Sequence, residues 1–148
     1  MKELIGKCIH NVYMNEDNTI LVFTTIWGEH YAYFVSGDCC SESWFESILN
    51  TEVLGQEQVI GFEIKDLPNA EADEDADHDG ECIQRYGYTL KTKKGYADIE
   101  FRNASNGYYG GSCRLMVDTK LISEDDKVYL EWGKEYSNPR ELLTRVIT

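Results

Sequence analysis

Short stretches of β-branched and aromatic residues, separated by turn clusters, dominate the first quarter of the chain. Residues 4–14, 19–25 and 30–36 have this composition, and alternate positions in the first differ in polarity. Polar or glycine-containing turns at 15–18 and 27–29 separate the three stretches. Strands joined by such short turns pair with their neighbours, so an antiparallel meander is predicted.

A second set of strands follows in the rest of the chain. The clearest alternation lies in residues 96–102, where Ala97, Ile99 and Phe101 face one way and charged residues face the other. A Lys93-Lys94-Gly95 turn should join this strand to the one before it as a hairpin. Further strands are predicted at residues 58–67, 85–92, 113–117 and 127–132.

Two segments have the spacing of short helices. Residues 43–49 carry apolar side chains at i, i+1, i+4 and i+5, with a serine and a glutamate at capping-box spacing. Near the C-terminus, Asn138 and Pro139 resemble a helix start, followed by apolar residues up to 147. The predicted fold is α+β, with a largely antiparallel sheet of about six to eight strands and one or two short helices on one face.

The length of the chain limits the number of domains, and its charge limits the kinds of partner. The 148 residues predict a single domain over 1–148, and residues 69–81 predict an acidic mobile loop within it because they lack a core-forming pattern. Seven acids and no basic residue lie within 71–81, and the net charge of the chain is −13. This charge argues against nucleic acid or an acidic membrane as a partner and permits a partner with a basic surface.

No targeting or membrane signal stands out in the sequence. The first residues lack a long apolar region with a small-residue cleavage site, and no run approaches the roughly 18 apolar residues of a membrane span. Five cysteines, an odd number, suit a reducing compartment. A cytoplasmic protein with free thiols is therefore expected.

The least generic stretch is GDCCSESWFESIL, residues 37–49. If a helix begins at Ser41 or Ser43, the adjacent Cys39 and Cys40 precede its N-terminus, where anions are favoured and thiol pKa values fall. A histidine from a neighbouring strand, His10 or His30, could then serve as a base. The alternative is that both cysteines pack as small hydrophobic residues while the serines cap the helix.

A second unusual stretch is the loop NASNGYYGG, residues 103–111, in which glycines permit close approach, asparagines offer amides and tyrosines offer stacking faces. The hypothesis is that this loop and the 37–49 stretch form one pocket or contact surface. An ordered turn whose tyrosines cover the core is the alternative. The candidate binding residues are Asp38, Cys39, Cys40, Glu42, Trp44, Asn103, Ser105, Asn106, Tyr108 and Tyr109.

Metal and cofactor motifs are weak in this chain. Adjacent cysteines point apart and seldom share a zinc ion, and a site made from His78, Cys82 and one cysteine of the 37–49 stretch is only a weakly signalled alternative. The run Asp75 to Gly80 begins like a calcium loop, but Tyr86 occupies the position of the required glutamate. No phosphate-binding or hydrolase motif occurs, so neither a cofactor nor a metal site is predicted.

Three stretches also resemble a known family. GDCCSESWFESIL, IEFRNASNGYYGG and the earlier NVYMNEDNTILVF are similar to an uncharacterised domain family of tailed bacteriophages and their bacterial hosts, over about residues 4–113. The family carries no established activity, so the resemblance implies a phage or prophage accessory protein in the host cytoplasm and no mechanism.

These observations favour a non-enzymatic binding protein that engages a host protein or sequesters a small ligand. A host partner with a basic surface, such as a defence nuclease, would suit the acidic chain. The alternatives are a cysteine-dependent enzyme at Cys39-Cys40 and a metal-stabilised module.

Overall fold

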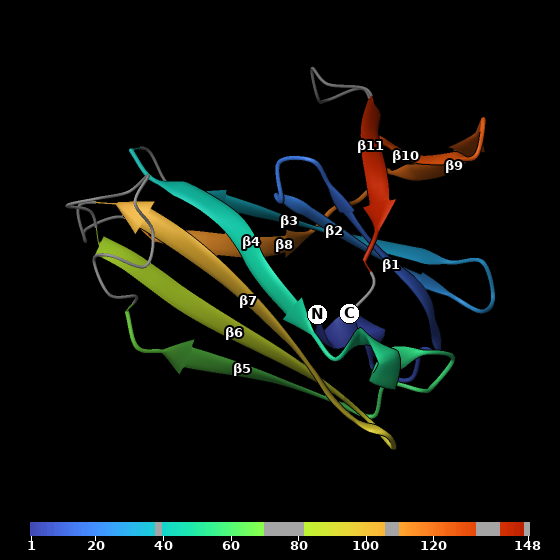
Figure 1. The fold of residues 1–148 in the computed structure, drawn as a ribbon, viewed down its shortest axis with the longest axis horizontal. Helices are drawn as coiled ribbons and strands as arrows, with labels where there is room; N and C mark the ends of the chain where they lie inside the picture. The colour runs from blue at the N-terminus through green and yellow to red at the C-terminus, as the bar shows by residue number, and fades with distance from the viewer. Residues whose placement is uncertain (38–39, 70–81, 106–109, 133–139, 147–148) are drawn as a thin grey trace.

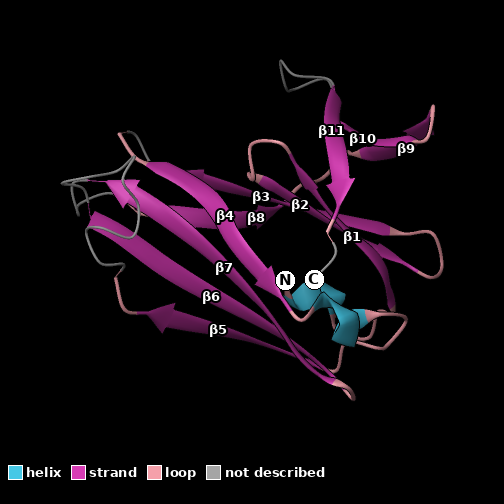
Figure 2. Ribbon diagram, in the orientation of Figure 1, coloured by secondary structure: helices cyan, strands magenta, loops and turns pink. Residues whose placement is uncertain are grey.

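Two antiparallel β-sheets form the protein in a computed structural model that describes residues 1–37, 40–69, 82–105, 110–132 and 140–146 (Figure 1). Within these residues the only helices are two short 3-10 turns, η1 (Lys2–Leu4) and η2 (Thr51–Leu54) (Figure 2). The predicted α+β class is therefore wrong, and the described chain is nearly all β. Neither 3-10 turn is long enough to cross a membrane.

The larger sheet has seven strands in the order β8-β3-β2-β1-β11-β10-β9. The first three strands pair in sequence as antiparallel neighbours, so the predicted meander is confirmed. The C-terminal strand β11 lies between β1 and β10. The strands are β1 (Ile9–Asn15), β2 (Ile20–Thr25), β3 (His30–Gly37), β8 (Gly111–Leu115), β9 (Lys120–Glu124), β10 (Lys127–Glu131) and β11 (Arg140–Arg145).

The smaller sheet has four strands in the order β4-β7-β6-β5. The hairpin formed by β6 and β7 runs through the predicted turn, with Thr92 paired to Gly95. Ala97, Ile99 and Phe101 are buried on one face of β7, as their alternation predicts. The strands are β4 (Glu42–Leu49), β5 (Gly61–Leu67), β6 (Cys82–Thr92) and β7 (Gly95–Ser105).

The main hydrophobic core lies between the two sheets. Buried side chains from both meet there, among them Phe23 and Tyr33 from the larger sheet and Phe45 and Phe101 from the smaller one. A second cluster packs on the opposite face of the larger sheet. Its buried members are Ile20, Val22, Ala32, Met116, Leu130 and Leu143. Strand β2 is consequently buried on both faces.

The predicted helix at residues 43–49 is strand β4. A β-bulge interrupts its pairing with β7 between Phe45 and Ser47, because Glu46 is an extra residue. The bulge makes Phe45 and Ile48 face the same core although they are three positions apart. A spacing of three is typical of a helix, so the bulge produces the pattern that led to the wrong prediction.

The predicted C-terminal helix is also a strand. Asn138 and Pro139 lie outside the described residues, and Arg140–Arg145 forms β11. Its residues pair with β10 on one side and β1 on the other, for example Leu143 with Val128 and with Asn15. Backbone pairing on both sides outweighs the local helix signal.

Candidate functional site

The two unusual sequence stretches lie side by side where β4 pairs with β7. Glu42 is opposite Ala104, Ser43 is opposite Asn103, and Trp44 is opposite Arg102. Since neighbouring residues of a strand point to opposite faces, this pairing divides the two stretches between two surfaces. We call these the inner face, which packs against the larger sheet, and the outer face.

The described candidate residues fall on different faces. Glu42 and Trp44 belong to the outer row, whereas Asn103 and Ser105 are buried on the inner face, at 0% and 1% exposure. Cys40 is exposed just before β4, with a positive φ of 69°. Asp38, Cys39, Asn106, Tyr108 and Tyr109 lie outside the described residues. The described candidates therefore do not line one pocket.

On the inner face, Asn103 connects polar side chains from three strands. The hydroxyl of Ser43 donates to Asn103 Oδ1 at 2.8 Å, and Asn103 Nδ2 donates to Gln84 Oε1 at 3.2 Å. The Tyr86 hydroxyl donates to the same Gln84 oxygen at 3.1 Å. A Cβ atom on Gly111 would collide with Ser43 Oγ, so glycine is required there. These bonds give Asn103 a structural role.

On the outer face, charged side chains form a row across three strands, which we call the charge ladder: Glu46, Arg102, Glu100 and Arg85. Arg85 Nη2 lies 2.7 Å from Glu100 Oε1, and Arg102 Nε lies 2.6 Å from Glu100 Oε2. Arg102 Nη1 is 3.8 Å from Glu46 Oε1, while Trp44 Nε1 donates to Glu46 Oε2 at 2.6 Å. The ladder holds the indole of Trp44 and both guanidinium groups in defined positions.

Glu100 is the central acid of the ladder. Burial by itself would raise its pKa, but hydrogen bonds from Arg85 and Arg102 and the charges of both outweigh this effect, so the pKa of Glu100 is lowered. The ionised carboxylate therefore stabilises the folded state. That stabilisation is complete above the ordinary value of 4.5 and is lost as the pH falls through the lower folded-state pKa.

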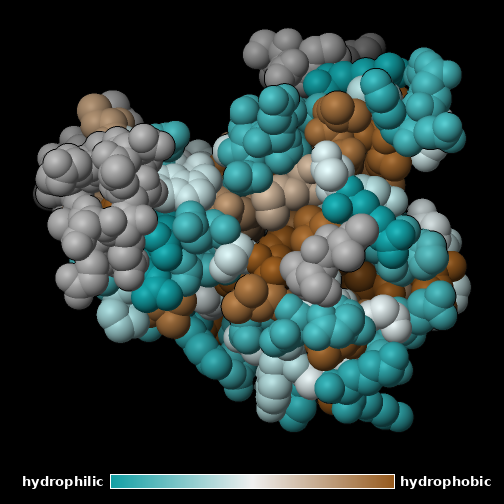
Figure 3. All heavy atoms as spheres, viewed as in Figure 1, coloured by the Kyte–Doolittle hydropathy of each residue, from teal (hydrophilic) through white to brown (hydrophobic). Residues whose placement is uncertain are grey.

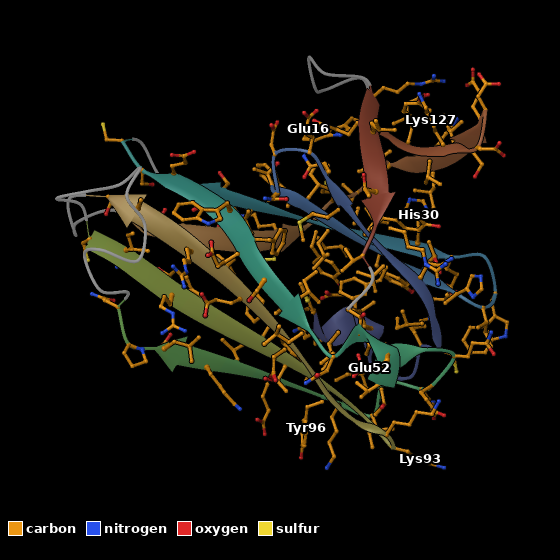
Figure 4. All side chains as sticks on the ribbon, viewed as in Figure 1. Glu16, His30, Glu52, Lys93, Tyr96 and Lys127 are labelled. Atoms are coloured by element: carbon orange, nitrogen blue, oxygen red, sulfur yellow. The ribbon has the colours of Figure 1, made fainter. Side chains whose placement is uncertain are left out.

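Glu100→Gln should reveal this linkage. At neutral pH the variant should be less stable than the wild type, and the difference should shrink as the pH falls below 4.5. Urea unfolding across this pH range measures it. Glu16→Gln is the control, because Glu16 lies in the turn between β1 and β2 and makes no ion pair in the described structure (Figure 4). A difference for Glu100→Gln that stays constant with pH would contradict the assignment.

A shallow hollow of about 180 Å³ lies next to the ladder on the outer face. Gly87 is one of the residues that line it, and its missing side chain leaves room beside Leu67 and Lys65. Leu49, 54% exposed, lies on the far side, and Asp98 accepts a hydrogen bond from Thr89 at 2.8 Å within it. The outer face thus combines an apolar hollow with a rim of oriented charges.

A second hollow of about 220 Å³ lies between β1, η2 and the end of β11, and includes His10, Glu52 and Arg145. In the view of Figure 3, hydrophobic residues also gather between β4 and β11. None of the described candidate binding residues lines this hollow. The candidate residue Trp44 instead belongs to the outer face, where its indole hydrogen-bonds Glu46 of the charge ladder.

Two described side chains that could take part in nucleophilic chemistry, Cys113 and His30, have defined surroundings. Burial raises the pKa of the Cys113 thiol to about 12, so it is protonated at neutral pH. His30 is the first residue of β3 in the larger sheet, and its Nε2 lies 2.9 Å from Oγ1 of Thr119, which precedes β9. Within the described ranges, no three His, Cys, Asp or Glu side chains are grouped closely enough to hold a metal. The acidic segment 70–81, including His78, lies outside those ranges.

Sequence reasoning missed all four ladder residues, Glu46, Arg102, Glu100 and Arg85. A usable signal was present, because residues 96–102 alternate and the Lys93-Lys94-Gly95 turn fixes the hairpin register. That register places Arg85 opposite Arg102, with Glu100 two residues away on the same face. Two facing arginines need an acid between them, and Glu100 meets that need.

Comparison with known proteins gives one match. A family model described as a domain of unknown function, DUF7448, matches residues 2–115, from η1 to the last residue of β8. No curated protein and no solved structure matches the chain. Strands β9, β10 and β11 lie beyond the matched residues.

Proposed function

We propose that this chain, which belongs to the DUF7448 family of domains of unknown function, is a non-enzymatic binding protein that engages another protein through the outer face of its four-stranded sheet. The proposal includes the expectation, from the resemblance of residues 37–49 and 99–111 to phage domains, that the partner is a bacterial host protein. One role that such a partner allows is inhibition of a host defence protein.

The observation that carries the proposal is the charge ladder beside the hollow at Gly87. Tryptophan and arginine are the residue types that most often dominate the binding energy of protein interfaces. Here Glu46 holds Trp44 and Glu100 holds the partly exposed Arg85 before any partner arrives, while the buried Arg102 contacts both acids. Side chains already ordered in the free protein lose less conformational freedom on binding, which increases affinity.

The hollow and the overall charge indicate the chemistry of the partner. Leu49 and Leu67 offer apolar contact to an anchoring side chain, and Asp98 lies where it could meet a positive charge on that side chain. The net charge of −13 would speed association with a basic surface. We therefore favour a partner that presents a lysine or arginine within a basic patch.

Affinity capture from a bacterial extract tests this proposal. Immobilised wild-type protein should retain a specific protein that Trp44→Ala loses, because the indole is a central contact of the proposed surface. Trp27→Ala is the matched control, since Trp27 is 61% exposed in the turn between β2 and β3 of the other sheet. Quantitative mass spectrometry of the three eluates provides the measurement.

Two results of the capture experiment distinguish binding through the outer face from binding elsewhere. Capture lost with Trp44→Ala and kept with Trp27→Ala supports the outer face. Equal retention by all three proteins assigns binding elsewhere and contradicts the proposal. Unfolding profiles of the variants must match the wild type, so that lost capture reports a lost contact and not a lost fold.

A further inference from the structure

Strand β5 ends the four-stranded sheet and pairs only with β6 among the described residues. Its seven residues, GFEIKDL, extend for roughly 23 Å at the usual rise per residue. Four of them, Glu63 to Asp66, are exposed. Backbone donors and acceptors along such an edge are open to pairing with a further strand.

The side chains of β5 divide between the two faces. Phe62 and Ile64 share the inner face with Leu90 and Tyr88, their partners on β6, and Ile64 is 64% exposed. Glu63 and Lys65 lie on the outer face, opposite Thr89 and Gly87. Within the described structure, neither Glu63 nor Lys65 makes an ion pair.

The centre of β5, Glu63 to Lys65, is complementary to itself. When two copies pair antiparallel about a two-fold axis through Ile64 and perpendicular to the sheet, Glu63 of one copy faces Lys65 of the other, and the reverse pair forms as well. Ile64 then faces Ile64 on the inner side. Opposite charges and apolar side chains directly across from one another are the pairs that stabilise a sheet.

We propose that β5 is a homodimer interface, through which two copies of this chain join their four-stranded sheets into one continuous sheet. The two sheets contribute four strands each. Isologous pairing of this kind is the commonest symmetry of soluble oligomers.

The two neighbouring registers are disfavoured by the same residues. Both outer faces stay on one side only if the pairing shifts by an even number of residues. An axis through Glu63 places the two Glu63 side chains opposite each other, and an axis through Lys65 does the same for the two lysines. Charged edge residues usually prevent pairing because like charges meet. In β5 they instead select one register.

The dimer would also enlarge the outer face. Lys65 borders the hollow at Gly87, so the hollows of the two copies would lie on either side of the two-fold axis. The dimer does not depend on the proposed partner, because self-association of the purified chain can be measured in the absence of any other protein.

Sedimentation analysis of the full chain tests the interface with a charge-swap cycle. The wild type should shift from monomer to dimer only at high protein concentration, because a two-strand interface is small and binds weakly. Glu63→Lys and Lys65→Glu should each lower the association constant at least about tenfold, since each change creates two like-charge contacts across the axis. The double variant Glu63→Lys/Lys65→Glu should recover dimerisation.

The controls match the change in net charge at distant sites. Glu16→Lys changes the net charge by the same amount as Glu63→Lys, and Lys127→Glu by the same amount as Lys65→Glu. Glu16 and Lys127 lie on the larger sheet or its turns, away from β5 (Figure 4). Both controls should dimerise like the wild type. A wild type that stays monomeric throughout, or single variants that dimerise unchanged, overturns the proposal. Failure of the double variant to recover overturns the register.

Discussion

Phe101→Ala should lower the free energy of unfolding by about 3–5 kcal/mol, the range for removal of a fully buried phenylalanine. Phe101 is 1% exposed, and its ring stacks on that of Tyr86 with centroids 4.6 Å apart. The rings of Tyr88 and Phe45 lie at centroid distances of 5.3 and 6.4 Å. Alanine would leave a cavity at the centre of this cluster.

Chemical denaturation measures the free energy of unfolding. The slope of this free energy against denaturant concentration should be the same for the variant and the wild type. Tyr96→Ala is the control on the same strand: Tyr96 is 51% exposed and points away from the core (Figure 4), so its loss should cost less than about 1 kcal/mol. Equal losses for the two variants would show that the aromatic cluster does not dominate the stability of the smaller sheet. Since Phe101 lies between Glu100 and Arg102 on β7, the same cavity should also loosen the charge ladder.

Asn103→Ala should cost about 2–3 kcal/mol of stability, because it leaves buried hydrogen-bonding groups without their partner. The Ser43 hydroxyl loses its acceptor and Gln84 Oε1 loses one of its donors. Ser47→Ala, on the opposite face of β4, should have almost no effect and serves as the control. Denaturation of the three proteins provides the values.

The double variant Ser43→Ala/Asn103→Ala refines this prediction. Removing both partners of a buried hydrogen bond costs less than the sum of the single changes, so we expect a coupling energy of about 1 kcal/mol. Strictly additive losses would mean that the bond is not formed. Full stability of Asn103→Ala would instead return Asn103 to the role of a binding residue, as the sequence analysis predicted.

The strands that sequence reasoning identified correctly are stretches of β-branched and aromatic residues bounded by clear turns, or stretches with uninterrupted alternation. Residues 96–102 alternate without a break, and the meander from β1 to β3 has clear turns, so these elements are confirmed. The segment Lys120–Glu124 was missed as a strand, because it is short and polar at its ends. The count of six to eight strands was too low, since the described residues contain eleven; besides β9, the difference comes from β4 and β11, which were predicted as helices.

The site could be predicted only in part, for a related reason. A helix at residues 43–49 would have grouped neighbouring candidates on one side, whereas a strand points Glu42 outward and Ser43 inward. The juxtaposition of 37–49 with 103–111 was anticipated as a hypothesis, and β4 does pair with the start of the second stretch. What the sequence could not supply was the bulge at Glu46, which depends on the register of β4 against β7.

The position of β11 has a kinetic consequence. Its pairing of Arg145 with Tyr13 joins residues that are 132 positions apart (145 − 13), so the chain must close a very long loop to form it. Contacts of such high sequence separation form slowly, and the meander of local hairpins is expected to assemble first. During this interval the far edge of β1 is open, and a nascent chain is most exposed to misassociation along that edge.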